Sequence, residues 1–126
     1  DWGHAKDYTE MQWRIMQQKK PKDYVIATGH AYSVKQFVNI AADYLGMKIL
    51  WSGKGLNEIG YTFNKNKKEI LIKIDKKYFR PNEVEYLKGD ASKALKDLKF
   101  KPKYSFKALV EDMIDNDLLE AKKELE

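Results

Sequence analysis

The chain has 126 residues, 43% hydrophobic and 34% charged, which predicts one domain over residues 1–126, short for a complete two-site enzyme. The absence of cysteine excludes disulfides and thiolate metal sites and fits a cytoplasmic location. Because there is no run of about 18 apolar residues, we expect neither a membrane span nor a signal peptide. The net charge of +5 invites a nucleic-acid function. However, the 24 basic residues are scattered among 19 acidic ones without a basic stripe, so we expect no nucleic-acid partner.

The first predicted element is a helix from about His4 to Gln18, which Lys19, Lys20 and Pro21 end. Its apolar face holds Tyr8, Met11, Ile15 and Met16, and Trp13 lies nearer the flank. His4 is the tempting functional residue because imidazole is the acid and base of neutral pH. No nucleophile or second ligand accompanies it, so a structural or ligand-edge role fits better than catalysis.

Residues 24–28 are apolar and predict a strand buried in a parallel sheet, which ends at Gly29. A helix should follow, with Ser33 as its cap, Gln36 completing a capping box and Gly46 ending it. Its predicted buried face consists of Val34, Phe37, Val38, Ile40, Ala41 and Leu45. The turn at Gly29 faintly resembles a dinucleotide-binding turn, but the later glycines and the acidic residue are absent, so we reject that interpretation.

A strand is predicted at residues 47–52, followed by a glycine-punctuated loop over residues 52–60. A β-hairpin should then begin near Tyr61, turn through residues 64–67 and return along residues 69–75. On the returning strand Ile70, Ile72 and Ile74 alternate with Leu71, Lys73 and Asp75, which predicts one wholly apolar face.

Beyond this strand the chain should break at Pro81, which keeps Arg80 out of helical conformation and cannot donate a backbone hydrogen bond. Asp90 can cap a helix that starts at Ala91 and runs to about Leu98. The final helix starts at Ser105, and its apolar stripe consists of Phe106, Leu109, Val110, Met113, Ile114 and Leu118.

The loop between these elements holds the two candidate binding residues, Arg80 and Glu83. Only Arg14 and Arg80 are arginines among the 24 basic residues, and a guanidinium binds phosphate or carboxylate as a bidentate fork that lysine cannot reproduce. Glu83 could accept hydrogen bonds from a pair of sugar hydroxyls. Local chemistry leaves a second interpretation open, in which the two side chains merely pair on the surface.

Residues 78–94, YFRPNEVEYLKGDASKA, resemble the C-terminal signature of the GDP-mannose 4,6-dehydratases of the extended short-chain dehydrogenase/reductase superfamily, YFRP-x-EV-x-x-L-x-GD-x-x-K-A. Three further stretches agree: DWGHAKDY at residues 1–8, DYVIATG at 23–29 and LKFKPKYSF at 98–106. The resemblance covers the whole chain in order. It implies an α/β fold, namely a C-terminal substrate-binding portion of several helices, short strands and a β-hairpin, without the cofactor-binding Rossmann half.

The resemblance also implies the activity of the intact enzyme. With NADP bound in its N-terminal domain, the enzyme would convert GDP-mannose to GDP-4-keto-6-deoxy-mannose, the precursor of GDP-fucose and related deoxysugars. Arg80 would then hold the diphosphate and Glu83 the ribose. The arginine that precedes DWGHAKD in the family would lie just before Asp1, and we expect this fragment to lack that Rossmann domain and the intact enzyme to be a homo-oligomer.

We find no catalytic residue, metal site or cofactor site in the chain, and expect the fragment to be inactive and to bind no NADP. The superfamily needs a tyrosine and a lysine one helical turn apart, and Tyr44/Lys48 and Tyr61/Lys65 have that spacing. Gly46 interrupts the first pair and the second lies in a hairpin, so neither keeps helical geometry. The alternative function is an independent module that binds nucleotides or acidic partners through its basic surface.

Overall fold

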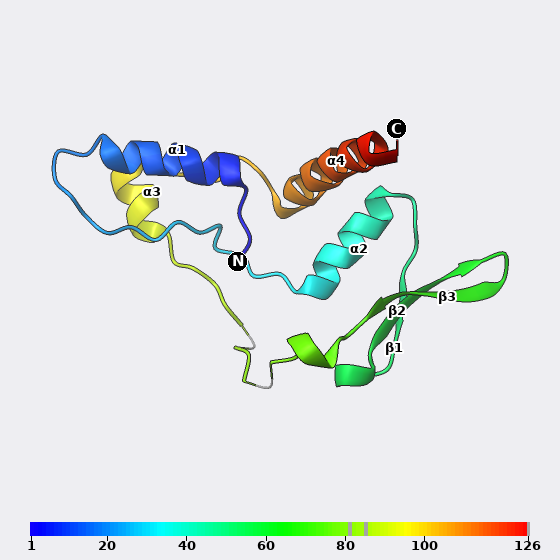
Figure 1. The fold of residues 1–126 in the computed structure, drawn as a ribbon. Helices are drawn as coiled ribbons and strands as arrows, with labels where there is room; N and C mark the ends of the chain where they lie inside the picture. Colours follow the sequence, from blue (N-terminus) through cyan, green and yellow to red (C-terminus); the bar gives the residue numbers. More distant parts are fainter. Residues whose placement is uncertain (81, 85, 126) are drawn as a thin grey trace. The chain divides into compact units, whose positions relative to one another are not determined.

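The computed structural model describes residues 1–80, 82–84 and 86–125, which form two compact units. Unit 1 comprises residues 1–37 and 86–125, and unit 2 comprises residues 38–80 and 82–84. Within the described residues there are four α-helices and one three-stranded antiparallel sheet (Figure 1). The α/β class is therefore confirmed, while the single domain over residues 1–126 stays a prediction.

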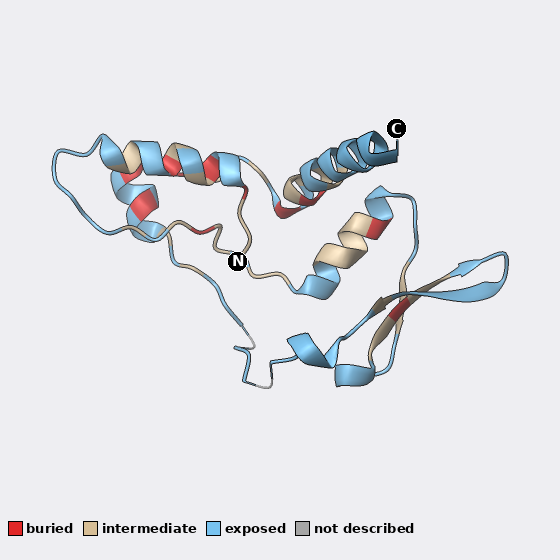
Figure 2. Cartoon of the chain, in the orientation of Figure 1, coloured by how far each residue is buried: buried red, intermediate tan, exposed pale blue. Residues whose placement is uncertain are grey.

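The main core of unit 1 lies between α1 (Ala5–Met16) and α3 (Ser92–Leu98), whose buried residues are red in Figure 2. Its centre consists of Met11, Ala94, Leu98 and Phe100, with Ile15, Tyr24, Ile26 and Ala91 packed around it. The predicted position of Met16 on the buried face is wrong, because its side chain is 79% exposed. Met16 is five residues beyond Met11 and therefore points well away from it at 100° per residue.

The strand predicted at residues 24–28 is not formed; this segment has no regular secondary structure. Its last backbone donors explain part of the difference, because the N–H groups of Thr28 and Gly29 donate to the carboxylate of Asp1 rather than to a neighbouring strand. Tyr24 and Ile26 still pack against the core, whereas Val25 is 53% exposed. The apolar character was thus read correctly, but the pairing was not.

An aromatic cluster in unit 1 joins the chain's first residues to the start of α4 (Phe106–Leu125). The ring of Phe106 stacks on that of Tyr32 at 4.0 Å and meets Trp2 edge-on at 5.8 Å, and Trp2 also contacts Phe37 at 5.0 Å. Ser105 caps α4 by accepting the Ala108 N–H, so the helix begins one residue after its predicted start. No helix within the described residues has the length and apolar character that crossing a membrane requires.

The helix α2 (Val34–Tyr44) begins and ends as its sequence predicts. At its start the N–H of Ser33 donates to Gln36 Oε1 at 2.7 Å and the N–H of Gln36 donates to Ser33 Oγ at 3.1 Å, which completes the capping box. At its end Gly46 has a φ of 71°, and the N–H groups of Gly46 and Met47 donate to the carbonyls of Asp43 and Ala42. The predicted buried face is only partly correct, since Val34 and Leu45 are exposed.

Unit 2 contains the sheet, in the order β1 (Leu50–Ser52), β2 (Ile59–Asn64) and β3 (Lys67–Lys73). The predicted hairpin is confirmed, and its two-residue turn has positive φ at both Lys65 and Asn66, the geometry that matches the twist of antiparallel strands. The first strand is shorter than predicted and starts at Leu50 rather than at residue 47.

The single apolar face predicted for Ile70, Ile72 and Ile74 is wrong. Tyr61 pairs with Ile70 and Gly60 pairs with Ile72, so Leu71 is an extra residue and forms a bulge. Ile70 and Ile72 consequently point to opposite faces, and Ile74 lies beyond the strand. Periodicity alone did not indicate this bulge, because every residue from Ile70 to Ile72 is apolar.

Candidate functional site

Arg80 and Glu83 lie together in a turn that follows η2 (Lys76–Tyr78), a short 3₁₀ helix of unit 2. The N–H of Glu83 donates to the carbonyl of Arg80 at 3.3 Å, and Arg80 Nη1 lies 3.6 Å from Glu83 Oε2. The two side chains are 80% and 59% exposed. The prediction for Pro81 lies outside the described residues.

The exposure of this pair sets its energy. An exposed ion pair contributes about 0–1 kcal/mol, so Arg80 and Glu83 hold one another only weakly. The surface interpretation therefore describes their arrangement without a ligand. A ligand that offers stronger partners could separate them at little cost.

Positive charge and aromatic surface surround the pair in sequence. Asp75 accepts the N–H of Lys77 at 2.9 Å and so begins the turn that presents Lys76, Lys77 and Tyr78. Tyr78 is well exposed, and Lys77 Nζ lies 5.4 Å from the centre of its ring. An anionic ligand with a planar ring would find suitable chemistry along this stretch.

The carboxylate of Asp1 in unit 1 accepts four hydrogen bonds, and sequence reasoning did not single it out. Its Oδ1 accepts from the N–H of Thr28 at 2.8 Å and from Thr28 Oγ1 at 2.6 Å. Its Oδ2 accepts from the N–H groups of Gly29 at 2.8 Å and Gly89 at 3.2 Å. One side chain thus joins the chain's beginning to two segments far along the sequence.

A cavity of about 660 Å³ lies in unit 1 beside these hydrogen bonds. One wall runs from Ala27 to His30, and another includes Lys88, Asp90 and Ser92. The carboxylate of Asp90 accepts from the N–H of Ser92 at 2.9 Å, but α3 begins at Ser92 and its N-cap position is Ala91, so the predicted cap at Asp90 is wrong by one residue.

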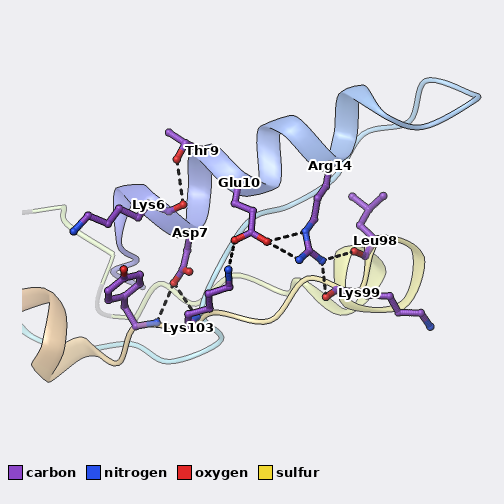
Figure 3. A network of polar contacts seen from close by, with 9 residues as sticks. Lys6, Asp7, Thr9, Glu10, Arg14, Leu98, Lys99 and Lys103 are labelled. Carbon is purple, nitrogen blue, oxygen red and sulfur yellow. Dashed lines mark hydrogen bonds and ion pairs between the residues drawn. The ribbon is translucent and has the colours of Figure 1, made fainter.

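The polar side of α1 braces the segment that follows α3, as Figure 3 shows. Asp7 is buried and its Oδ2 accepts from the N–H groups of Lys103 and Tyr104. Arg14 donates from Nη1 to the carbonyls of Leu98 and Lys99 at 2.9 and 3.0 Å, and from Nε and Nη2 to Glu10. The guanidinium of Arg14 is therefore used as a fork that holds the end of α3.

The contacts of the Glu10 carboxylate have an electrostatic consequence. Its hydrogen bonds with Lys103 and Arg14 hold the pKa of this carboxyl below its ordinary value, because both partners favour the ionised form. The brace is thus charged on both sides at neutral pH.

His4 has a structural role, one of the two that its sequence context allowed. Its Nδ1 accepts the N–H of Lys6 and caps α1, its Nε2 lies 3.1 Å from Asp112 Oδ2, and its ring stacks on Tyr104 at 4.1 Å. Because Nδ1 is an acceptor, the proton is assigned to Nε2, which donates to Asp112. This hydrogen bond holds the pKa of the Asp112 carboxyl below its ordinary value, assisted by the charge of Lys6.

As predicted, neither Tyr44/Lys48 nor Tyr61/Lys65 has helical geometry. Tyr44 is the last residue of α2, and Lys48 lies beyond its glycine stop. Lys65 occupies the hairpin turn, and the ring of Tyr61 is instead approached by Lys68 Nζ at 4.0 Å. The described residues contain no cluster of three or more histidines and carboxylates that could hold a metal ion.

Residues 1–113 match a family model described as GDP-mannose 4,6 dehydratase. The chain is 46% identical to the GDP-mannose 4,6 dehydratase of Drosophila melanogaster over 94% of its own length and 29% of that protein's. It is 43% identical to that of Homo sapiens over 94% of the chain and 31% of the relative. The Yersinia enterocolitica protein is 42% identical over 97% and 35%. The chain therefore spans about a third of these relatives.

Proposed function

The chain belongs to the GDP-mannose 4,6-dehydratase family, and from this premise we propose that it is the C-terminal, nucleotide-binding part of such an enzyme. The complete dehydratase, meaning a protein with this chain and the remaining length of its relatives, would convert GDP-mannose to GDP-4-keto-6-deoxy-mannose with loss of water. This product would serve GDP-fucose and deoxysugar synthesis in the cytoplasm.

The observation that supports this assignment is the turn of Arg80 and Glu83 within the segment that resembles the family signature. The turn presents a guanidinium and a carboxylate side by side, both well exposed. Two phosphate groups would attract Arg80 away from Glu83, because a charge-assisted bidentate contact is stronger than an exposed ion pair. Glu83 would then accept hydrogen bonds from the ribose hydroxyls. We refer to these two residues as the nucleotide grip.

The residues of this chain do not fit the NADP that the family implies. A dinucleotide site needs free backbone N–H groups at a turn before a helix, and the candidate turn precedes α2. There the N–H groups of Thr28 and Gly29 already donate to Asp1. We therefore assign NADP binding to the Rossmann domain in the part of the relatives that this chain does not span.

We also propose a strand partner for the apolar segment 24–28. It is apolar, has no regular secondary structure and no strand partner among the described residues, and Val25 is 53% exposed. We assign its pairing to a strand of the Rossmann domain in an extended short-chain dehydrogenase/reductase fold, and expect the complete dehydratase to be a homo-oligomer. Light scattering of the chain alone should then reveal self-association, whereas a compact monomer at high concentration would contradict this assignment.

Calorimetric titration of GDP into the complete dehydratase tests the nucleotide grip. Arg80→Lys keeps the charge but loses the fork, so it should weaken binding by about 1.5–3 kcal/mol, roughly ten- to hundredfold. Glu83→Gln should weaken binding less, because an amide oxygen still accepts.

Lys65→Gln at the hairpin turn is the matched control, since it removes a charge distant in sequence from the nucleotide grip. If binding depended on a general basic surface, Lys65→Gln would weaken it and Arg80→Lys would not. Unchanged affinity in Arg80→Lys would contradict the nucleotide grip.

A further inference from the structure

Tyr78 presents an aromatic ring to solvent two residues before Arg80, in the same unit and in a stretch that the structure describes without a gap. Its side chain is 72% exposed, more than that of any other tryptophan, tyrosine or phenylalanine among the described residues. The Lys77 ammonium lies 5.4 Å from the ring centre, and a cation–π contact at such an exposed site is weak. The ring therefore contributes little to the packing of unit 2 and is accessible to a ligand.

Hydrogen bonds of η2 hold the backbone that carries this ring. The carboxylate of Asp75 accepts from the N–H of Lys77 at 2.9 Å, and its carbonyl accepts from the N–H of Tyr78 at 3.1 Å. The N–H of Phe79 donates to the carbonyl of Lys76 at 3.3 Å. The main chain is thus fixed before, at and after Tyr78. A planar ring on a fixed backbone loses little conformational freedom when a ligand stacks on it, which favours binding.

Phe79 sets the separation of Tyr78 from Arg80. Phe79 is extended, with a φ of −72° and a ψ of 125°, so the Cα atoms of its two neighbours lie roughly 6.6 Å apart, two steps of an extended chain. Tyrosine and arginine have long side chains, so one small ligand can contact both. In a nucleoside diphosphate, one ribose joins a planar base to the anionic diphosphate. The turn therefore offers an aromatic surface for the base close to the guanidinium that would hold the diphosphate.

We propose that Tyr78 stacks on the base of the nucleotide whose diphosphate and ribose are bound by the nucleotide grip. This inference rests on the proposed function of Arg80 and Glu83. Stacking uses the face of the base, which every base possesses, so it adds affinity without selecting one base. Tyr78 should therefore matter only for ligands that carry a base, whereas Arg80 should matter for every ligand that carries the diphosphate.

The test is calorimetric titration of GDP and of inorganic pyrophosphate into the complete dehydratase and its Tyr78→Leu and Arg80→Lys variants. Tyr78→Leu should weaken GDP binding about five- to twentyfold, within the range that stacking of a base on an aromatic side chain provides. The same variant should bind pyrophosphate as the wild type does, because pyrophosphate has no base. Arg80→Lys should weaken the binding of both ligands. If pyrophosphate binds too weakly to titrate, its displacement of GDP gives its affinity.

Two further variants separate the ring from its hydroxyl and from its surroundings. Tyr78→Phe keeps the ring and should recover most of the GDP affinity that Tyr78→Leu loses. Phe63→Leu is the matched control, because it removes another exposed ring of unit 2, 57% exposed on β2 and distant in sequence from η2. It should change the affinity for neither ligand.

The outcomes distinguish the stacking role from the nucleotide grip. If Arg80→Lys weakens GDP binding and Tyr78→Leu does not, the stacking role is refuted and the grip stands. Equal losses of GDP and pyrophosphate affinity in Tyr78→Leu would show that the ring supports the turn instead of the base, which also refutes stacking. A loss in Tyr78→Phe as large as that in Tyr78→Leu would assign the effect to the hydroxyl. If Arg80→Lys binds both ligands like the wild type, the grip is refuted and the stacking role falls with it.

Discussion

Replacing Arg14 by lysine should destabilise the chain without removing a charge. The guanidinium donates four hydrogen bonds, two to Glu10 and one each to the carbonyls of Leu98 and Lys99. A single ammonium reaches either the carboxylate or the end of α3, so two or three of these contacts are lost. Each is worth about 0.5–1.5 kcal/mol net, but the side chain is 31% exposed and water replaces part of the loss. We therefore expect the free energy of unfolding to fall by about 1–2 kcal/mol.

Urea unfolding of the 126-residue chain measures this loss, with Arg80→Lys as the matched control. Both variants exchange arginine for lysine, and these are the only two arginines present. The exposed Arg80 should contribute no more than about 0.5 kcal/mol to stability, so its variant should unfold like the wild type. An unfolding free energy of Arg14→Lys within about 0.5 kcal/mol of the wild type would refute the brace at the end of α3.

Three further results are expected. Gly89→Ala should lower the free energy of unfolding by about 1–3 kcal/mol, because its Cβ would lie 2.3 Å from that of Ala27. An unchanged free energy in urea unfolding would contradict this expectation. The hydrogen bond from Lys22 holds the pKa of the Asp97 carboxyl below its ordinary value of 3.8, so its stabilisation is present above about pH 4 and lost on further acidification. Asp97→Asn should therefore flatten the fall in stability below about pH 4. A dependence of stability on pH that is unchanged in this acid range would contradict the prediction. The chain alone should form no 4-keto product from GDP-mannose and NADP in a chromatographic assay, and product formation would overturn the placement of the chemistry elsewhere.

Features that depend on neighbouring residues could be predicted from the sequence. The capping box of Ser33 and Gln36 and the glycine stop at Gly46 are set by hydrogen bonds within a few residues. The hairpin turn at Lys65 and Asn66 is equally local. Side-chain and backbone chemistry within one turn of chain was sufficient for each.

Features that depend on distant partners could not be predicted in this way. The bulge at Leu71 depends on the register with β2, and the segment 24–28 has no strand partner among the described residues. The contact of Asp1 with Gly89 crosses 88 residues of sequence and that of Arg14 with Leu98 crosses 84, and a carboxylate in such a contact resembles any surface acid in the sequence. One signal was available for Arg14, since the scarcity of arginine that drew attention to Arg80 applied to it equally.

A crystal structure of the complete dehydratase with bound GDP would test the central claim most directly. We expect the guanidinium of Arg80 to leave Glu83 and to donate to diphosphate oxygens at about 2.7–2.9 Å, with Glu83 accepting from the ribose hydroxyls. GDP bound in full occupancy by other residues, with Arg80 still paired to Glu83, would contradict the nucleotide grip.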